Sequence, residues 1–135
     1  MNNFELIKHA KQALKNSYSP YSNFPVGVAL LTKQGKIYYG TNIENASYGA
    51  TNCAERSAIF SALSQGEKAE NFIKIAIISN MQEFTYPCCI CRQVMGEFFT
   101  TEVEILMVNC QEEYQTVNIK ELVPYIFTKK ELENV

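Results

Sequence analysis

The middle of the chain alternates between strand-like and helix-like segments, and this alternation constrains the fold more than any other feature of the sequence. Strand–helix–strand order implies parallel crossovers, with helices that cover a sheet. Lys33-Gln34-Gly35 reads as a hairpin between the first two predicted strands, 26–32 and 36–40. A hairpin joins antiparallel strands, so the predicted sheet is mixed. The predicted strands cover residues 26–32, 36–40, 73–79 and 103–109, and the helices between them cover residues 53–64 and 88–99.

The two ends of the chain complete this plan. Apolar residues at Phe4, Ile7, Ala10 and Leu14 have helical spacing and predict an amphipathic helix over residues 3–15. We therefore expect one α/β domain over the whole chain. The remaining predicted segments are loops over residues 17–25 and 41–52, a short strand over residues 117–119, and short helices over residues 119–123 and 128–134.

Charge and hydropathy argue against two classes of partner. Twelve Lys and Arg residues stand against fourteen Asp and Glu residues, which gives a net charge of −2. Dedicated nucleic-acid binders are usually basic, so we expect no polynucleotide partner. The longest apolar run, residues 26–31, is far too short for a membrane span, and the first residues lack the apolar stretch of a signal peptide. We expect a cytoplasmic protein that does not enter a membrane.

The cysteines point to metal or redox chemistry. There are five of them, an odd number that cannot form a complete set of disulfides. Cys88, Cys89 and Cys91 lie within four residues, and such clustering in a cytosolic chain is typical of metal or redox sites. Because His9 is the only histidine, a metal site in this chain must be mostly thiolate.

Two predicted helices begin at cysteines. Cys88 and Cys91 lie one turn apart on one helix face, directly after Pro87, and Cys53 lies in the first turn of the other helix. Helix N-termini favour thiolates. Both helices follow strands, so their N-termini should meet at one edge of the sheet. Three thiolates there would supply three of the four ligands of zinc and leave the fourth position open, which is the catalytic pattern.

Other interpretations of these cysteines stay open. Cys110 ends a strand that runs toward the same edge, and as a fourth ligand it would make a closed, structural zinc site. Cys88 and Cys91 alone also match a thiol–disulfide motif. Cys89 points about 100° away from Cys88 around the helix and would be a poor ligand. His9 is the other spare candidate.

Glu55 lies on the apolar stripe of its helix, in line with Ile59 and Leu63. A carboxylate there is costly unless it is paired or protonated. The simpler interpretation is an acid in the first helical turn that reaches solvent. Arg56 directly follows Glu55 and Arg92 directly follows Cys91; both could donate hydrogen bonds to thiolate sulfurs, or both could be ordinary surface arginines.

These residues together match the three-cysteine form of the zinc-deaminase signature, here Cys53-Ala54-Glu55 followed by PCCIC at residues 87–91. With the longer motifs around them, the chain resembles the short, single-domain, three-cysteine class of cytidine deaminases over nearly its whole length. One departure is Cys89, where such enzymes commonly carry a small residue, often glycine. The motifs are YSPYSNFPVGVALLT (18–32), GTNIENASYGATNCAERSAIF (40–60), PCCICRQVMGEF (87–98) and ELVPYIF (121–127).

The resemblance implies a fold and an activity. The fold would be a three-layer α/β/α sandwich around a mixed, roughly five-stranded sheet. The activity would be hydrolytic deamination of cytidine and deoxycytidine to uridine and deoxyuridine in pyrimidine salvage, with no organic cofactor. One Zn²⁺ per chain would be held by Cys53, Cys88 and Cys91, and Glu55 would shuttle protons to ring N3 and to the leaving amine. Similar short enzymes are homotetramers with shared active sites.

The resemblance also implies contacts to a nucleoside substrate. Asn42 and Glu44 would bind the ribose hydroxyls, and Phe24 would stack on the pyrimidine. Without the resemblance, the first two would simply be solvated and Phe24 would fasten its loop. The other implied contacts are the backbone at Ala54 and at Pro87–Cys88 to the base edge, Phe127 in a neighbouring subunit's active site (otherwise a core residue under the last helix), and Tyr48 at a subunit interface.

Three rival functions remain in view. The first is deamination of another small aminopyrimidine nucleoside, and the NIENASYG stretch at residues 42–49 argues against it. The second is a polynucleotide editor on the same fold, and the net charge of −2 argues against it. The third is a non-catalytic zinc module or a thiol redox protein, which would have no use for Glu55.

Overall fold

Five strands form one mixed sheet in the computed structural model, which describes residues 1–133. The strand order is β2-β1-β3-β4-β5. Strands β3 and β4 are parallel, and the other neighbouring pairs are antiparallel. The predicted mixed sheet is therefore confirmed. The strands are β1 (Val26–Thr32), β2 (Ile37–Thr41), β3 (Phe72–Ser79), β4 (Glu104–Val108) and β5 (Tyr114–Val117).

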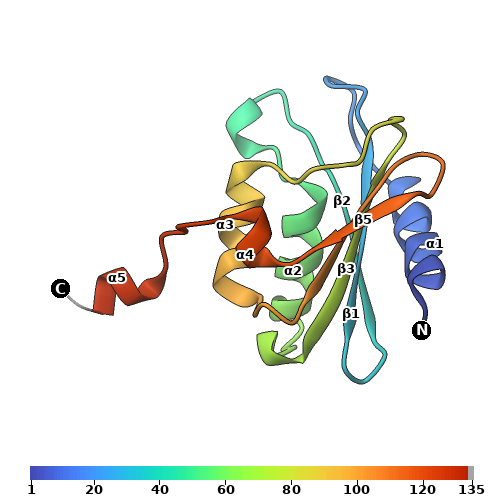
Figure 1. Cartoon of the computed structure of the whole chain (residues 1–135). Coiled ribbons are helices and arrows are strands. Elements are labelled where there is room, and N and C mark those ends of the chain that lie inside the picture. Colours follow the sequence, from blue (N-terminus) through green and yellow to red (C-terminus); the bar gives the residue numbers. More distant parts are fainter. Residues whose placement is uncertain (134–135) are drawn as a thin grey trace.

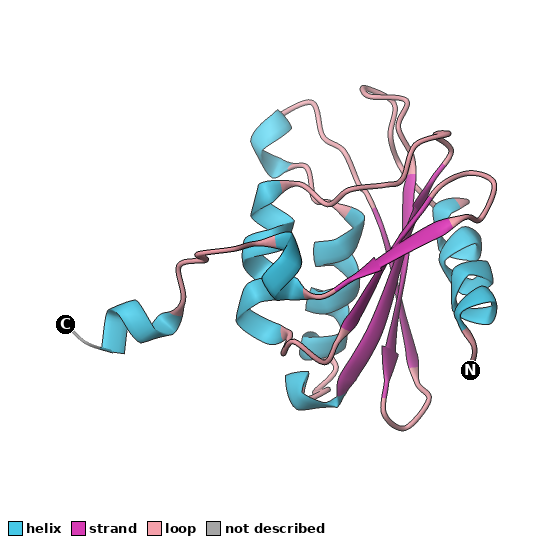
Figure 2. Ribbon diagram, in the orientation of Figure 1, coloured by secondary structure: helices cyan, strands magenta, loops and turns pink. Residues whose placement is uncertain are grey.

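Helices cover both faces of this sheet, so the molecule has the three layers that were expected (Figure 1). Helix α1 (Asn3–Leu14) covers one face, and α2 (Ala54–Ser64) and α3 (Cys89–Phe98) cover the other. The short helix α4 (Ile119–Leu122) lies against α3, whereas α5 (Lys129–Glu133) lies away from the body at the end of the chain (Figure 2). Two 3-10 turns, at Tyr48–Ala50 and Ala69–Asn71, were not predicted.

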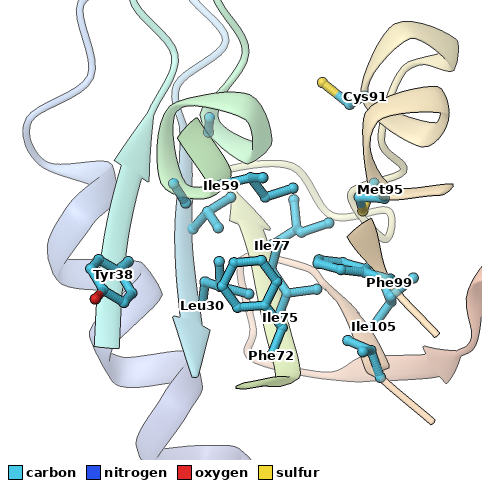
Figure 3. Close-up of a cluster of buried hydrophobic side chains, with 14 of the residues drawn as sticks. Leu30, Tyr38, Ile59, Phe72, Ile75, Ile77, Cys91, Met95, Phe99 and Ile105 are labelled. Atoms are coloured by element: carbon cyan, nitrogen blue, oxygen red, sulfur yellow. The ribbon is translucent and has the colours of Figure 1, made fainter. Parts of the chain in front are cut away.

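Strand β1 shows how the sequence produces two cores. All seven of its residues are buried, because helices cover both faces of the sheet. Val28 and Leu30 point into the cluster beneath α2 and α3, and Ala29 and Leu31 point into the cluster beneath α1. Figure 3 shows the larger cluster, in which Leu30 and residues of β3 pack against Ile59, Met95 and other residues of the two helices.

The last strand lies earlier in the chain than predicted. The prediction placed it at residues 117–119, whereas β5 ends at Val117. The hairpin before it is closed by Asn109, whose Oδ1 atom accepts hydrogen bonds from the amides of Gln111 and Glu113 at 3.0 Å each. Because β5 is a half-exposed edge strand, it lacks the apolar run by which the other strands were found. The predicted helix over 128–134 corresponds to α5, and Asn134 lies outside the described residues.

The topology brings the starts of α2 and α3 to one edge of the sheet. Strands β2 and β3 run in the same direction, because each is antiparallel to β1 between them. Helix α2 also rests directly on β2 at Gly40. A Cβ atom on Gly40 would lie 2.2 Å from the carbonyl oxygen of Ala54 and 2.5 Å from the amide of Ala58, so only glycine permits this approach.

Within residues 1–133, none of the helices combines the length and the hydropathy needed to cross a lipid bilayer.

Candidate active site

Three cysteine sulfurs meet at this edge of the sheet. The Sγ atoms of Cys53, Cys88 and Cys91, hereafter the cysteine cluster, lie within 4.8 Å of one another, and those of Cys53 and Cys88 are 3.7 Å apart. Sulfur ligands at about 2.3 Å from a tetrahedral zinc ion would lie about 3.8 Å apart. The geometry and the donor set therefore fit zinc. Among the described residues the group has three members, which leaves a fourth ligand position open.

Two of the cysteines are N-cap residues and do not lie in the first helical turn as predicted. Cys53 precedes α2 and Cys88 precedes α3, and both have extended backbone conformations. Neither side chain makes a capping hydrogen bond, so both sulfurs are free to bind a metal ion. Cys91 lies on α3, one turn before Met95 (Figure 3), and it is fully buried.

Arg56 lies against two of the sulfurs. Its Nε atom donates to Sγ of Cys91 at 3.4 Å, and its Nη2 atom donates to Sγ of Cys53 at 3.3 Å. Hydrogen bonds from Cys91 and Arg56 lower the pKa of the Cys53 thiol to about 5. The hydrogen bond with Cys53, together with burial, raises the pKa of the Cys91 thiol. The guanidinium thus offsets part of the negative charge that thiolate ligands carry.

In the described part of the chain, Arg92 makes no hydrogen bond to a sulfur, so of its two interpretations the one that made it a donor to the cysteines is wrong. Its Nε atom donates to the carbonyl oxygen of Pro87 at 2.8 Å, and its Nη1 atom donates to the carbonyl oxygen of Leu122 at 3.1 Å. The reason is helical geometry, since a residue next to Cys91 points about 100° away from it around the helix. Arg92 instead ties the turn before α3 to the end of α4.

Glu55 is buried beside the cysteine cluster. Its side chain lies in the first turn of α2, and the residue is only 4% exposed, so it does not reach solvent as the simpler interpretation of the sequence proposed. Burial raises the pKa of Glu55 to about 7, and the neighbouring Cys53 adds to this shift. A carboxyl group with such a pKa can both accept and release a proton near neutral pH.

The remaining candidate ligands lie outside the cluster. Cys110 is exposed in the turn after β4, where its amide donates to the carbonyl oxygen of Met81 at 2.8 Å. His9 lies on α1, on the other face of the sheet, and its Nδ1 atom is 2.7 Å from the hydroxyl of Tyr39. Cys89 is exposed and is not a member of the group. A closed four-ligand site is not what the described residues form.

Asn42 is buried and bound to residues 17–26, not solvated. Its Oδ1 atom accepts hydrogen bonds from the Ser17 hydroxyl at 2.5 Å and from the Val26 amide at 2.9 Å. Its Nδ2 atom donates to the carbonyl oxygen of Phe24 at 2.8 Å. The Ser17 hydroxyl and two backbone groups therefore fix the orientation of the amide, and within residues 1–133 one N–H of Nδ2 has no partner.

Glu44 binds the same loop. Its Oε1 atom accepts from the amides of Tyr21 and Ser22 at 3.0 Å each, and its Oε2 atom accepts from the Ser22 hydroxyl. These bonds hold the pKa of Glu44 below its usual range, and the bond from the Ser22 hydroxyl has the largest effect. Sequence reasoning missed Ser22, because its partner lies 22 residues away and no local pattern joins the two. Glu44 lines a cavity of about 310 Å³ together with Tyr21, Ser22, Tyr48 and Thr51.

The other predicted contact residues differ in exposure. Ala54 is fully buried at the start of α2, and Phe24 is 36% exposed. Tyr48 is 75% exposed and Phe127 is 57% exposed, so Phe127 does not close a core within this chain. The carbonyl oxygen of Phe127 accepts a hydrogen bond from Nε2 of Gln93 at 2.8 Å, which holds the segment that leads to α5 against α3.

Comparisons with known proteins agree with this geometry. Residues 2–107 match the family described as the cytidine and deoxycytidylate deaminase zinc-binding region. A cytidine deaminase from Halalkalibacterium halodurans is 43% identical over 129 residues, which are 96% of each chain. One from Sporosarcina psychrophila is 40% identical over 128 residues, which are 95% of this chain and 93% of that protein. The crystal structure of a cytidine deaminase from Burkholderia pseudomallei superposes with a TM-score of 0.91 at 43% identity, and the match covers 94% of this chain and all of that one.

Proposed function

The chain belongs to the cytidine and deoxycytidylate deaminase family, and on that premise we propose that it hydrolyses cytidine and deoxycytidine to uridine and deoxyuridine with release of ammonia. The single observation that carries this proposal is the buried Glu55 next to a three-cysteine cluster with an open ligand position. A purely structural zinc site would be closed and would gain nothing from a buried acid. We also propose that residues 1–135 form one deaminase domain.

Zinc is the cofactor that the site fits. Cys53, Cys88 and Cys91 would hold it, and Arg56 would donate to two of the sulfurs. When bound there, zinc supplies a Lewis acid that makes water a better nucleophile near neutral pH.

Glu55 would carry the protons of the reaction. It would take one proton from the attacking water and give it to ring N3, and then pass the other water proton, from the oxygen added at C4, to the amine that leaves C4. Its pKa of about 7 suits both directions of transfer. Burial also keeps bulk water from competing with the substrate for this carboxyl group.

The side of the site that carries Asn42, Glu44 and Phe24 would hold the nucleoside. The free N–H of Asn42 and the ionised carboxylate of Glu44 would bind the sugar hydroxyls, and Phe24 would stack on the base. Support comes from the extended backbone at Ile43, which pairs with Asn52, because it places the side chains before and after Ile43 on one side. The backbone at Ala54 and at Pro87–Cys88 would contact the base edge.

We further propose that the active form is a cytoplasmic homotetramer with shared active sites. Phe127 would enter the site of a neighbouring subunit and Tyr48 would lie at an interface. Their exposed fractions of 57% and 75% support this arrangement, since large aromatic side chains are enriched at subunit contacts. The five unpaired cysteines suit a reducing compartment.

The proposal is tested by ammonia release, or by loss of ultraviolet absorbance, when purified zinc-loaded protein is given cytidine. Glu55→Gln should retain one zinc per chain and lose turnover by about a thousandfold or more, because the proton relay is gone. A near-wild-type rate in this variant would contradict the role of Glu55. No turnover by the wild type, with zinc still bound, would favour a different aminopyrimidine or a non-catalytic zinc module.

A further inference from the structure

Residues 17–25, hereafter the front loop, carry Phe24 and are held by the two residues assigned to the sugar. The link on one side is Ser22. Its hydroxyl donates to Oε2 of Glu44 and accepts a hydrogen bond from the amide of Phe24 at 3.0 Å. Its own amide donates to Oε1 of Glu44 at 3.0 Å. A single side chain therefore joins the carboxylate of Glu44 to the backbone of Phe24.

The backbone between Ser22 and Phe24 makes this link specific. Asn23 has a φ of 55°, in the left-handed region, and its amide donates to the carbonyl oxygen of Ser19 at 3.0 Å. The Ser22 hydroxyl thus accepts from the backbone amide two residues further on, which is the pattern of a serine turn. Without that hydroxyl, the Phe24 amide would lose its partner in the loop.

The link on the other side is Asn42, which accepts from the Val26 amide and donates to the carbonyl oxygen of Phe24 at 2.8 Å. Both backbone polar groups of Phe24 are thus tied to the sugar-side residues, the N–H through Ser22 to Glu44 and the C=O directly to Asn42. The aromatic ring is consequently placed by the same groups that would meet the sugar.

We propose that Ser22 is a positioning residue that couples recognition of the sugar by Glu44 to stacking of the base by Phe24. This inference rests on the proposed function, in which Glu44 binds a sugar hydroxyl and Phe24 stacks on the pyrimidine. A hydroxyl that binds Glu44 holds the carboxylate in the orientation in which it accepts from Ser22, and this in turn holds Phe24. Such coupling is reciprocal. Binding of the sugar should strengthen stacking of the base by the same free energy by which stacking of the base strengthens binding of the sugar.

The test is a thermodynamic cycle that combines one change in the enzyme with one change in the substrate. Initial rates are measured for wild type and Ser22→Ala with cytidine and with 2′,3′-dideoxycytidine, which lacks the 2′- and 3′-hydroxyls of the sugar. With cytidine, Ser22→Ala should raise KM about tenfold, on the scale of one or two hydrogen bonds, and leave kcat within about twofold. The loss of kcat/KM caused by removing the hydroxyls should be several-fold smaller in Ser22→Ala than in the wild type.

Two further variants separate this role from general damage to the loop. Ser22→Thr keeps a hydroxyl at the same place and should restore most of the wild-type KM. Ser19→Ala is the matched control, because within residues 1–133 the only hydrogen bond of the Ser19 hydroxyl is the one it accepts from the Ser17 hydroxyl at 3.3 Å. Its kinetic constants should stay within about twofold of the wild type.

A second measurement does not depend on activity. In the zinc-loaded protein without substrate, amide exchange followed by NMR should be at least about tenfold faster at Phe24 in Ser22→Ala, and unchanged in Ser19→Ala. Equal substrate penalties in wild type and Ser22→Ala, or unchanged exchange at Phe24, would overturn the coupling while the deaminase proposal stands. A wild type that does not turn over cytidine would overturn the proposed function and the coupling with it.

Discussion

The cysteine cluster and the front loop are two parts of the proposed site, and they are held in place by different means. The cluster lies at the starts of two helices that pack into the core; Cys91 is fully buried, Cys53 is half-buried and Cys88 is exposed. The front loop has exposed residues, among them Ser22 and Phe24, and it is anchored by the side chains of Asn42 and Glu44.

This difference divides the work of the site. Groups carried by helices that pack into the core adjust less than groups on a loop, so they suit chemistry, in which atoms must be placed before the reaction begins. Groups fixed by a few side-chain hydrogen bonds can adjust at low cost, so they suit binding. Changes in the cluster should therefore act on zinc and on kcat, and changes in the loop should act on KM.

The strongest challenge to this division is removal of a zinc ligand. Cys91→Ala should weaken zinc binding by more than about a hundredfold and abolish turnover, since loss of even a supporting partner costs about 10- to 100-fold. Metal analysis and ammonia release measure the two effects. Cys110→Ser is the matched control and should keep one zinc per chain. If Cys110→Ser lost zinc instead, the fourth ligand would be a cysteine and the open position would not exist.

Next in size is the change of the arginine that contacts the cluster. Arg56→Gln should weaken zinc binding about 10- to 100-fold, because two sulfurs lose a charged donor and the pKa of Cys53 rises. Competition with a chelator measures this. Arg92→Gln is the matched control, with zinc affinity unchanged and a lower melting temperature, because Arg92 binds two backbone carbonyl groups. Equal zinc affinities in the two variants would remove the distinction between them.

On the loop side, the larger effect should come from Asn42→Ala. The variant should raise KM for cytidine about tenfold and leave zinc content and kcat nearly unchanged. It should also lower the free energy of unfolding by about 1–3 kcal/mol, because backbone groups of Phe24 and Val26 lose their partner. Kinetics and urea denaturation measure these quantities, with the exposed Asn45→Ala as control. A drop in kcat with unchanged KM would place Asn42 on the chemical side of the division.

The smallest expected effect is a shift in pH dependence. Hydrogen bonds hold the pKa of Glu44 below its ordinary value of 4.5, so the carboxylate stays ionised as the pH falls through that value. The part of KM that depends on Glu44 should therefore stay constant down to about pH 5 and rise only when Glu44 is protonated, whereas the titration of Glu55 near pH 7 acts equally in both proteins. In Ser22→Ala the hydroxyl that donates to Glu44 is lost, so the pKa of Glu44 rises and the increase in KM should begin at higher pH. Identical KM profiles for the two proteins would show that Ser22 does not act on Glu44.

The same division explains what could be predicted from the sequence. The convergence of Cys53 with Cys88 and Cys91 follows from helical spacing and from strand direction, both of which are local or topological. The contacts of Asn42 and Glu44 join residues 16 to 25 positions apart through side chain and backbone, and no periodicity reports them. The suggested hydrogen bond from Arg92 to a sulfur is not formed, because a residue next to Cys91 in the sequence points in another direction around the helix.

The distance along the chain between the members of the cysteine cluster also bears on how this protein folds. Cys53 and Cys88 are 35 residues apart, and their sulfurs meet only after β3 has inserted beside β1, which then separates it from β2. Cys88 and Cys91 are neighbours at the start of α3, but closing the loop that brings Cys53 to them costs chain entropy, so the complete cluster requires the long-range strand order. Zinc bound to all three cysteines would therefore favour, by mass action, chains whose central strands have closed in this order.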